Sequence, residues 1–79
     1  MRRRMAQHPD AVSFNEARRV LEAFGWELNR VRGSHHIFGR GSERINIPLR
    51  RPHIRPTYVR DVLDATASGG SDDDKPDDT

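Results

Sequence analysis

The spacing of apolar residues predicts an amphipathic helix over residues 14–24. Apolar side chains recur there at three- and four-residue intervals, with polar and charged positions between them, and the stripe consists of Ala17, Val20, Leu21 and Phe24. Ser13 and Glu16 have the spacing of a capping box, in which the serine hydroxyl accepts a hydrogen bond from the backbone three residues on. Gly25 then supplies the left-handed residue that commonly ends a helix.

A second apolar stripe predicts a helix over residues 57–67. Its members are Val59, Val62, Leu63 and Ala67. Pro56 suits the first turn of this helix, because a backbone N–H at that position would have no partner inside the helix. Pro48 and Pro52 cannot donate to a sheet ladder, so residues 48–55 are predicted to form a loop.

Alternating segments predict three short strands between the two helices. In the first, over residues 26–31, strict alternation places Trp26, Leu28 and Arg30 on one face. A turn at Gly33-Ser34 leads into the second strand, residues 35–38, and residues 39–42 turn the chain into the third, residues 44–47. Strands joined by such short turns pair antiparallel.

The order helix, three strands, helix predicts an α+β fold, a two-layer sandwich with both helices on one face of a three-stranded antiparallel sheet. The other face of the sheet is expected to be open. The expected core comprises the apolar residues that face the interface between the layers: Val20, Leu21, Phe24, Trp26, Leu28, Ile45, Ile47, Val62 and Leu63.

Charge is distributed unevenly along the chain and defines three parts. Residues 1–70 hold 13 Arg against 7 acidic residues, whereas residues 71–79 hold one Lys against 5 Asp. Residues 1–12 show no apolar periodicity and are expected to be a flexible basic arm, and residues 68–79 are expected to be a disordered acidic tail. Residues 13–67 form the expected domain, and their basic charge favours a polyanionic partner.

Composition excludes several classes of protein. A chain of 79 residues without cysteine forms neither two domains nor a disulfide scaffold, and it has no thiolate to hold a metal. Apolar runs do not exceed two residues, far below the roughly 20 needed to cross a bilayer, so a cytoplasmic location without a membrane partner is expected. Neither a nucleophile-elbow motif nor a phosphate-binding glycine loop is present, so no cofactor is expected.

The adjacent histidines His35 and His36 are the most informative candidates for chemistry. Side chains of neighbouring strand residues point to opposite faces, so the two cannot share a metal ion, and no metal site is predicted. An imidazole with an unperturbed pKa of about 6.5 is suited to acid–base chemistry near neutral pH. Arg30 and Arg32 flank His35 in the sequence. From spacing alone, a solvated or locally hydrogen-bonded histidine is the favoured interpretation of His35, and motif spacing does not overturn it.

Four segments, in this order and spacing, resemble the HicA family of toxins over roughly residues 13–66. They are Phe24-Gly25-Trp26-Glu27-Leu28, the run from Arg30 to Phe38, Ile45-Asn46-Ile47-Pro48, and Pro56 followed by Arg60-Asp61-Val62-Leu63. The most specific of them is Gly33-Ser34-His35-His36-Ile37-Phe38 downstream of a Gly-Trp pair.

This resemblance implies an mRNA interferase of a type II toxin–antitoxin system with a double-stranded-RNA-binding-domain-like α-β-β-β-α fold. In HicA-like proteins the catalytic histidine follows Gly-Ser or Gly-Gly, which corresponds to His35, and a HicB-like antitoxin masks it. The mechanism implied is metal-independent cleavage, in which an RNA 2′-hydroxyl attacks its own phosphate. The candidate RNA-binding residues are Arg30, Arg32, Ser34, His36, Arg50 and Arg51.

Three points remain open at the level of sequence. Neither His36 nor His53 is singled out as a second proton-transfer group. The chain is also compatible with a non-catalytic module that binds RNA on an open basic sheet face. A basic domain that associates with DNA or with protein alone is a further alternative, although no helix presents Asn, Gln and Arg along one face for base recognition.

Overall fold

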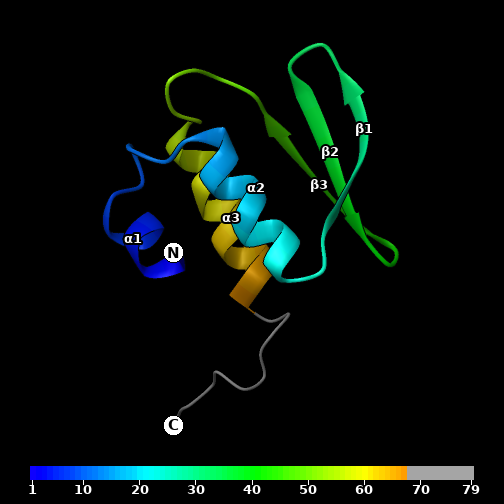
Figure 1. Ribbon diagram of the computed structural model, residues 1–79, viewed down its shortest axis with the longest axis horizontal. Coiled ribbons are helices and arrows are strands. Elements are labelled where there is room, and N and C mark those ends of the chain that lie inside the picture. Colours follow the sequence, from blue (N-terminus) through cyan, green and yellow to red (C-terminus); the bar gives the residue numbers. More distant parts are fainter. Residues whose placement is uncertain (68–79) are drawn as a thin grey trace, which may run out of the picture.

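The computed structural model describes residues 1–67 and contains three helices and one three-stranded sheet (Figure 1). The predicted acidic tail, residues 68–79, lies outside the described residues. In chain order the elements are α1 (Arg2–Gln7), α2 (Phe14–Ala23), β1 (Glu27–Arg32), β2 (His35–Arg40), β3 (Glu43–Pro48) and α3 (Pro56–Ala67).

The sheet has the order β1-β2-β3 with both pairs antiparallel, and the helices lie on one side of it (Figure 1). The structure thus confirms the predicted α+β sandwich with its double-stranded-RNA-binding-domain-like order. β3 lies nearest α2 and α3, whereas β1 is at the outer edge (Figure 1). The position of β1 leaves all six of its residues exposed.

Both predicted helices form close to their expected bounds. The Ser13 hydroxyl accepts a hydrogen bond from the backbone N–H of Glu16 at 3.1 Å, as expected for the cap of α2. Gly25 follows this helix with a φ of +91°, a conformation that glycine adopts without a steric penalty. α3 begins at Pro56, as the sequence predicts.

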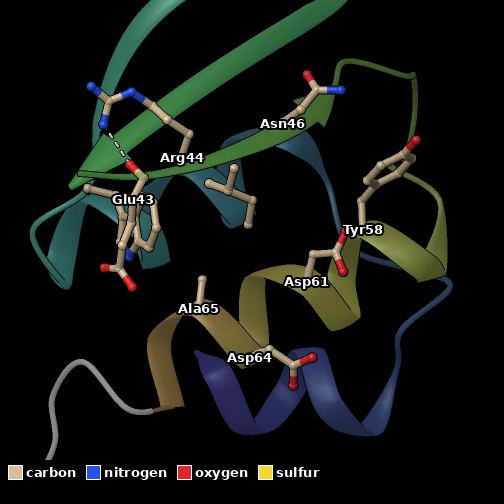
Figure 2. Close-up of a pocket in the computed structure, with 9 residues that line it drawn as sticks. Glu43, Arg44, Asn46, Tyr58, Asp61, Asp64 and Ala65 are labelled. Atoms are coloured by element: carbon tan, nitrogen blue, oxygen red, sulfur yellow. Dashed lines mark hydrogen bonds between the residues drawn. The ribbon is translucent and has the colours of Figure 1, made fainter. Parts of the chain in front are cut away.

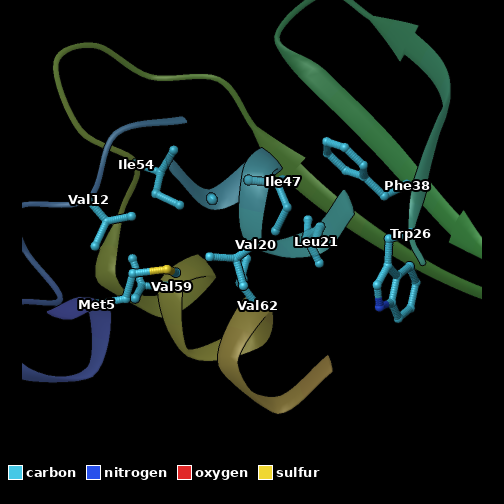
Figure 3. Packing of buried hydrophobic residues seen from close by; sticks show 11 residues of the cluster. Met5, Val12, Val20, Leu21, Trp26, Phe38, Ile47, Ile54, Val59 and Val62 are labelled. Carbon is cyan, nitrogen blue, oxygen red and sulfur yellow. The ribbon is translucent and has the colours of Figure 1, made fainter. Parts of the chain in front are cut away.

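The core lies between the sheet and the two long helices and continues toward α1 (Figure 3). Of the predicted core residues, five are buried: Val20, Leu21, Trp26, Ile47 and Val62. Phe24, Ile45 and Leu63 are only partly buried and pack against this cluster. Two further buried residues, Ala17 and Val59, belong to the predicted helix stripes. The buried residues that the pattern did not single out are Met5, Val12, Phe38 and Ile54.

The expectation of a flexible arm over residues 1–12 is wrong, because part of this segment folds as α1 against α3. Met5 is fully buried. Arg2 donates through Nε to the Thr66 hydroxyl at 2.8 Å and through Nη2 to the Leu63 carbonyl at 3.0 Å. Arg4 binds both carboxylate oxygens of Glu16 at 2.8–2.9 Å. One buried residue in a six-residue helix shows no periodicity, so the sequence pattern could not indicate it.

Leu28 is not a core residue, and the alternation predicted for the first strand is interrupted. Leu28 pairs with Phe38 and therefore faces the helix side, but no helix covers the outer strand and the side chain is 42% exposed. Between Leu28 and Arg30 the register shifts by one residue, which is a β-bulge. Arg30 consequently pairs with Ile37 and faces the opposite side of the sheet from Leu28.

Candidate functional site

His35 and His36 occupy opposite faces of β2. His36 lies on the helix side, half-buried, with its ring centroid 4.7 Å from that of Phe14 at the start of α2. Its Nδ1–H donates to the Ser34 carbonyl at 2.9 Å, since a carbonyl can only accept. His35 lies on the open face and is exposed. Only His35 is therefore accessible from the side of the sheet that the helices leave free.

The turn that precedes His35 is built to bring the strand start to the surface. Gly33 has a φ of +57° at the first central position of a two-residue hairpin turn, where glycine is favoured. The carbonyl of Ser34, the other turn residue, also accepts a hydrogen bond from the Leu49 N–H at 2.7 Å. This bond ties the turn to the end of β3 and fixes the place of His35.

Register places two arginines on the same face as His35. Arg32 is the direct cross-strand partner of His35, and Arg30 pairs with the next residue on that face, Ile37. Directly opposed side chains in a sheet have Cβ atoms roughly 4.5–5.5 Å apart, and diagonal neighbours are within reach of long side chains. Among residues 1–67, neither Arg30 nor Arg32 forms an ion pair, and both are exposed. Their guanidinium groups are available to an anion beside His35.

Arg44 lies on the open face as well, but its guanidinium group is already hydrogen-bonded to backbone carbonyls of the protein. Its Nη1 donates to the carbonyls of Gly41 at 2.9 Å and Glu43 at 2.7 Å. A Cβ at Gly39 would meet this guanidinium at 2.8 Å and would also collide with the side chain of Asn29. Glycine at position 39 thus lets two polar side chains cover the far end of the open face.

Asn46 is a site residue that sequence reasoning missed. Its side-chain nitrogen lies 3.0 Å from Nδ1 of His35, and its buried side-chain oxygen has no partner among the described residues. Alternation along the third strand was sufficient to place Asn46 on the face opposite Ile45 and Ile47. Only the register of β3 against β2, in which Asn46 pairs with Ile37, brings it next to His35.

The remaining predicted RNA-binding residues are distributed differently. Ser34 is exposed in the turn beside His35. Arg50 and Arg51 lie in the loop after β3, where they line a hollow of about 240 Å³ with Ser13 and Phe14 at the start of α2. The structure therefore brings Arg30 and Arg32 together with His35 on the open face, while Arg50 and Arg51 border the N-terminal end of α2 at the same end of the sheet.

Among the described residues there is no group of three His, Cys, Asp or Glu side chains that could hold a metal ion. The site therefore consists of one imidazole, one amide and two guanidinium groups on the open face. This combination can move a proton and stabilise negative charge. In the part of the chain that the structure describes, no helix has the length and apolar character needed to span a bilayer.

Comparison with known proteins identifies one family. A family model described as the HicA toxin of bacterial toxin–antitoxin systems matches residues 14–66, which include α2, the whole sheet and most of α3. The search of curated proteins and the search of solved structures each returned no match.

Proposed function

Because the chain belongs to the HicA family of bacterial toxin–antitoxin toxins, we propose that it is an endoribonuclease that cleaves mRNA in the cytoplasm with His35 as its catalytic residue. The observation that carries this proposal is the exposed imidazole of His35 on the open sheet face, beside Arg30 and Arg32. No metal takes part in the proposed reaction.

The proposed reaction is an attack of a ribose 2′-hydroxyl on its own 3′-phosphate. Nε2 of His35 takes the 2′-hydroxyl proton as the O2′–P bond forms. The P–O5′ bond then breaks, and the protonated imidazole returns a proton to the departing 5′-oxygen. The product ends are a 2′,3′-cyclic phosphate and a 5′-hydroxyl. DNA lacks the attacking group and is not a substrate.

Arg30 and Arg32 are proposed to stabilise the charge that develops on the phosphate in the transition state. Guanidinium groups donate bidentately to phosphate oxygens, and the charge on both side chains is not neutralised by a carboxylate among residues 1–67. Ser34, Arg50 and Arg51 are proposed to contact RNA around this centre, whereas His36, a predicted RNA-binding residue, lies on the helix side against Phe14 and is not part of it. Of these, Arg50 and Arg51 would hold the strand where it passes the end of α2.

Asn46 is proposed as the residue that orients His35. With the amide nitrogen facing Nδ1, the neutral imidazole carries its proton on Nε2 and cannot act as a base there. Rotation of the amide by 180° turns its oxygen toward Nδ1, so that the oxygen accepts from Nδ1–H and Nε2 has a free lone pair. In this arrangement the Asn46 oxygen is bound to His35, and the amide NH2 group takes the buried position that the oxygen occupied.

A protein antitoxin is the partner implied by the family. We propose that it is HicB-like and that it covers the open sheet face over His35. This arrangement inhibits the toxin by excluding RNA, because the face is otherwise exposed.

The deciding experiment compares end-labelled RNA, the same RNA with a single 2′-deoxy residue at the cleaved position, and the matching DNA, all in EDTA. Cleavage of the RNA alone, with a 2′,3′-cyclic phosphate at the new end, is the expected result. Retention of RNA without cleavage would instead support the alternative function, an RNA-binding module, which the open basic face also favours. Cleavage of the 2′-deoxy substrate would contradict the mechanism.

A further inference from the structure

A groove of about 700 Å³ runs between β3 and α3 and borders the site described above at Asn46 (Figure 2). β3 forms one wall with Ile45 and Asn46, and α3 forms the other with Tyr58, Asp61, Asp64 and Ala65. In Figure 2 Tyr58 and Asp61 extend from α3 toward the strand, and Asp64 lies at the lower edge of the helix. Apolar, aromatic and acidic side chains therefore line one continuous depression.

The strand wall of this groove has unpaired backbone groups. Within residues 1–67, β3 pairs with β2 alone and its other edge is free. In an antiparallel ladder, successive residues direct their backbone N–H and C=O groups to opposite sides of the strand. Leu49 directs its N–H toward the β2 side, where it donates to the Ser34 carbonyl, so every second residue before it also faces β2 and the residues between them face the free edge. Arg44 and Asn46 therefore direct their backbone groups toward the groove side. The same alternation turns Pro48 outward, where a residue without an N–H is tolerated.

The helix wall is acidic in a protein whose folded part is basic. Asp61 and Asp64 are exposed on α3, and neither forms an ion pair with another described residue. Glu43, at the strand end of the groove, is already paired with Arg40 at 2.9 Å. Arg44 also lines the groove, with its guanidinium bound to the Gly41 and Glu43 carbonyls. The two unpaired aspartates outweigh this single positive charge, so the net sign of the groove favours a cationic ligand.

Trp26 provides a second, independent indication of a ligand. It lines the groove and is only 3% exposed, yet its indole N–H has no acceptor among the described residues. One face of its ring is covered by the Arg40 guanidinium at 4.8 Å from the centroid. A buried donor without an acceptor is unfavourable by about 1–3 kcal/mol, and a carbonyl group brought into the groove would relieve this cost.

We propose that this groove binds an extended, basic segment of a partner protein, which adds to the free edge of β3 as a fourth strand. Its main chain pairs with the backbone groups of Arg44 and Asn46. Lys or Arg side chains at alternate positions face α3 and reach Asp61 and Asp64. Alternate positions on a strand are about 6.8 Å apart, and Asp61 and Asp64 are separated by a rise of about 4.5 Å along α3, a difference that flexible basic side chains can span.

Charge separates this surface from the RNA site. The segment's other side chains lie on the open face, next to Arg44, where neutral or acidic residues are favoured. Phosphate groups would be repelled by Asp61 and Asp64, so RNA is the less suitable occupant of the groove. The partner segment can bind at the edge of the sheet while the face that carries His35 stays open.

The test is a titration of the full ¹⁵N-labelled chain with a short peptide of alternating threonine and lysine, followed by NMR. Saturable shifts of the Arg44, Asn46 and Asp64 amide signals are expected, together with slower hydrogen exchange at Arg44 and Asn46. An Asp61→Asn/Asp64→Asn double variant should weaken binding about fivefold, since each exposed ion pair contributes roughly 0.5 kcal/mol.

An Asp10→Asn/Glu27→Gln double variant is the matched control, because it removes the same charge away from the groove and should bind the peptide like the unmodified protein. Equal weakening in both double variants would reduce the effect to non-specific attraction and overturn the proposal. Shifts confined to Leu28 and Val31 on β1, or equal binding of a peptide of alternating threonine and glutamate, would do the same. Saturable shifts of Asp61 and Asp64 by an RNA oligonucleotide would assign the groove to nucleic acid instead.

Discussion

His35 and His36 are neighbours in sequence, but their surroundings differ because they point to opposite faces of one strand. His35 is exposed and contacts Asn46, with Arg32 as its cross-strand partner. His36 is half-buried against Phe14, and its Nδ1–H is bound to the backbone. The comparison shows that the two-residue period of a strand can bury one histidine in packing contacts and expose the next to solvent, although the two residues are of the same type.

The same division extends along β2. Phe38 follows His36 on the helix side and is fully buried, whereas Ile37 follows His35 on the open side and is half-buried. Substitutions on the helix side should therefore change the free energy of unfolding, and those on the open side should change RNA binding or the rate of RNA cleavage. The following predictions test this separation, beginning with the largest effect.

Replacing His35 with alanine should lower the rate of RNA cleavage by about 10²- to 10⁴-fold, because the proposed proton acceptor is lost. Its thermal midpoint should be close to that of the unmodified protein, since the side chain is exposed. Cleavage assays on the purified variant, with circular dichroism as a folding check, measure both quantities. Full activity in a folded His35→Ala protein would reject the proposed role.

Replacing Phe38 with alanine should lower the free energy of unfolding by about 3–5 kcal/mol, the usual range for removing a buried aromatic ring. Replacing Ile37 with alanine should lower it by only about 1 kcal/mol, because that side chain is partly exposed. Denaturant unfolding of the two variants compares adjacent positions directly. Equal effects would show that the helices do not divide the strand into a covered and an open side.

Replacing Asn46 with leucine should lower the cleavage rate by about 10- to 10²-fold, because His35 loses the group that orients its ring. The ¹⁵N chemical shifts of the His35 ring should also change, since they report which nitrogen carries the proton. A purely structural role for Asn46 would leave the His35 ring shifts as they are. Unchanged ring shifts together with an unchanged rate would contradict the positioning role.

Replacing Arg32 with glutamine should weaken RNA binding and reduce the dependence of log affinity on log salt by about one, as expected for the loss of one phosphate contact. The matched control is Arg44→Gln, because Arg44 is bound to backbone carbonyls and not directed at the site. Titrations at several salt concentrations measure the slopes. Identical slopes for both variants would remove Arg32 from the RNA interface.

The smallest effect is expected for His36→Ala, which should lower the free energy of unfolding by about 1 kcal/mol through loss of the Phe14 contact. Its cleavage rate should remain within about threefold of the unmodified rate, well below the change that loss of a general base produces. Denaturant unfolding and the cleavage assay measure the two quantities. A loss of cleavage as large as that of His35→Ala would show that the covered histidine takes part in the reaction.

Much of the fold could be predicted because its signals are local. The capping box at Ser13, the stripes of α2 and α3 and the turn residues between strands each depend on a few neighbouring residues. α1 could not be predicted, because Met5 is buried only through packing that the rest of the chain creates. Leu28 was wrongly predicted as a core residue for a related reason. Alternation indicates which face of the sheet a side chain lies on, but it does not indicate whether a helix covers that face.

The sequence by itself determined the order of α2, the three strands and α3, the family, and the position of His35 at the start of a strand. It did not determine what surrounds His35. Strict alternation would put Arg30 on the side of Leu28, and only the bulge between them turns Arg30 and Arg32 to the face of His35. Asn46 likewise meets His35 through the pairing of β2 with β3. Register is a property of strand pairs, and a shift of one residue reverses every side chain that follows.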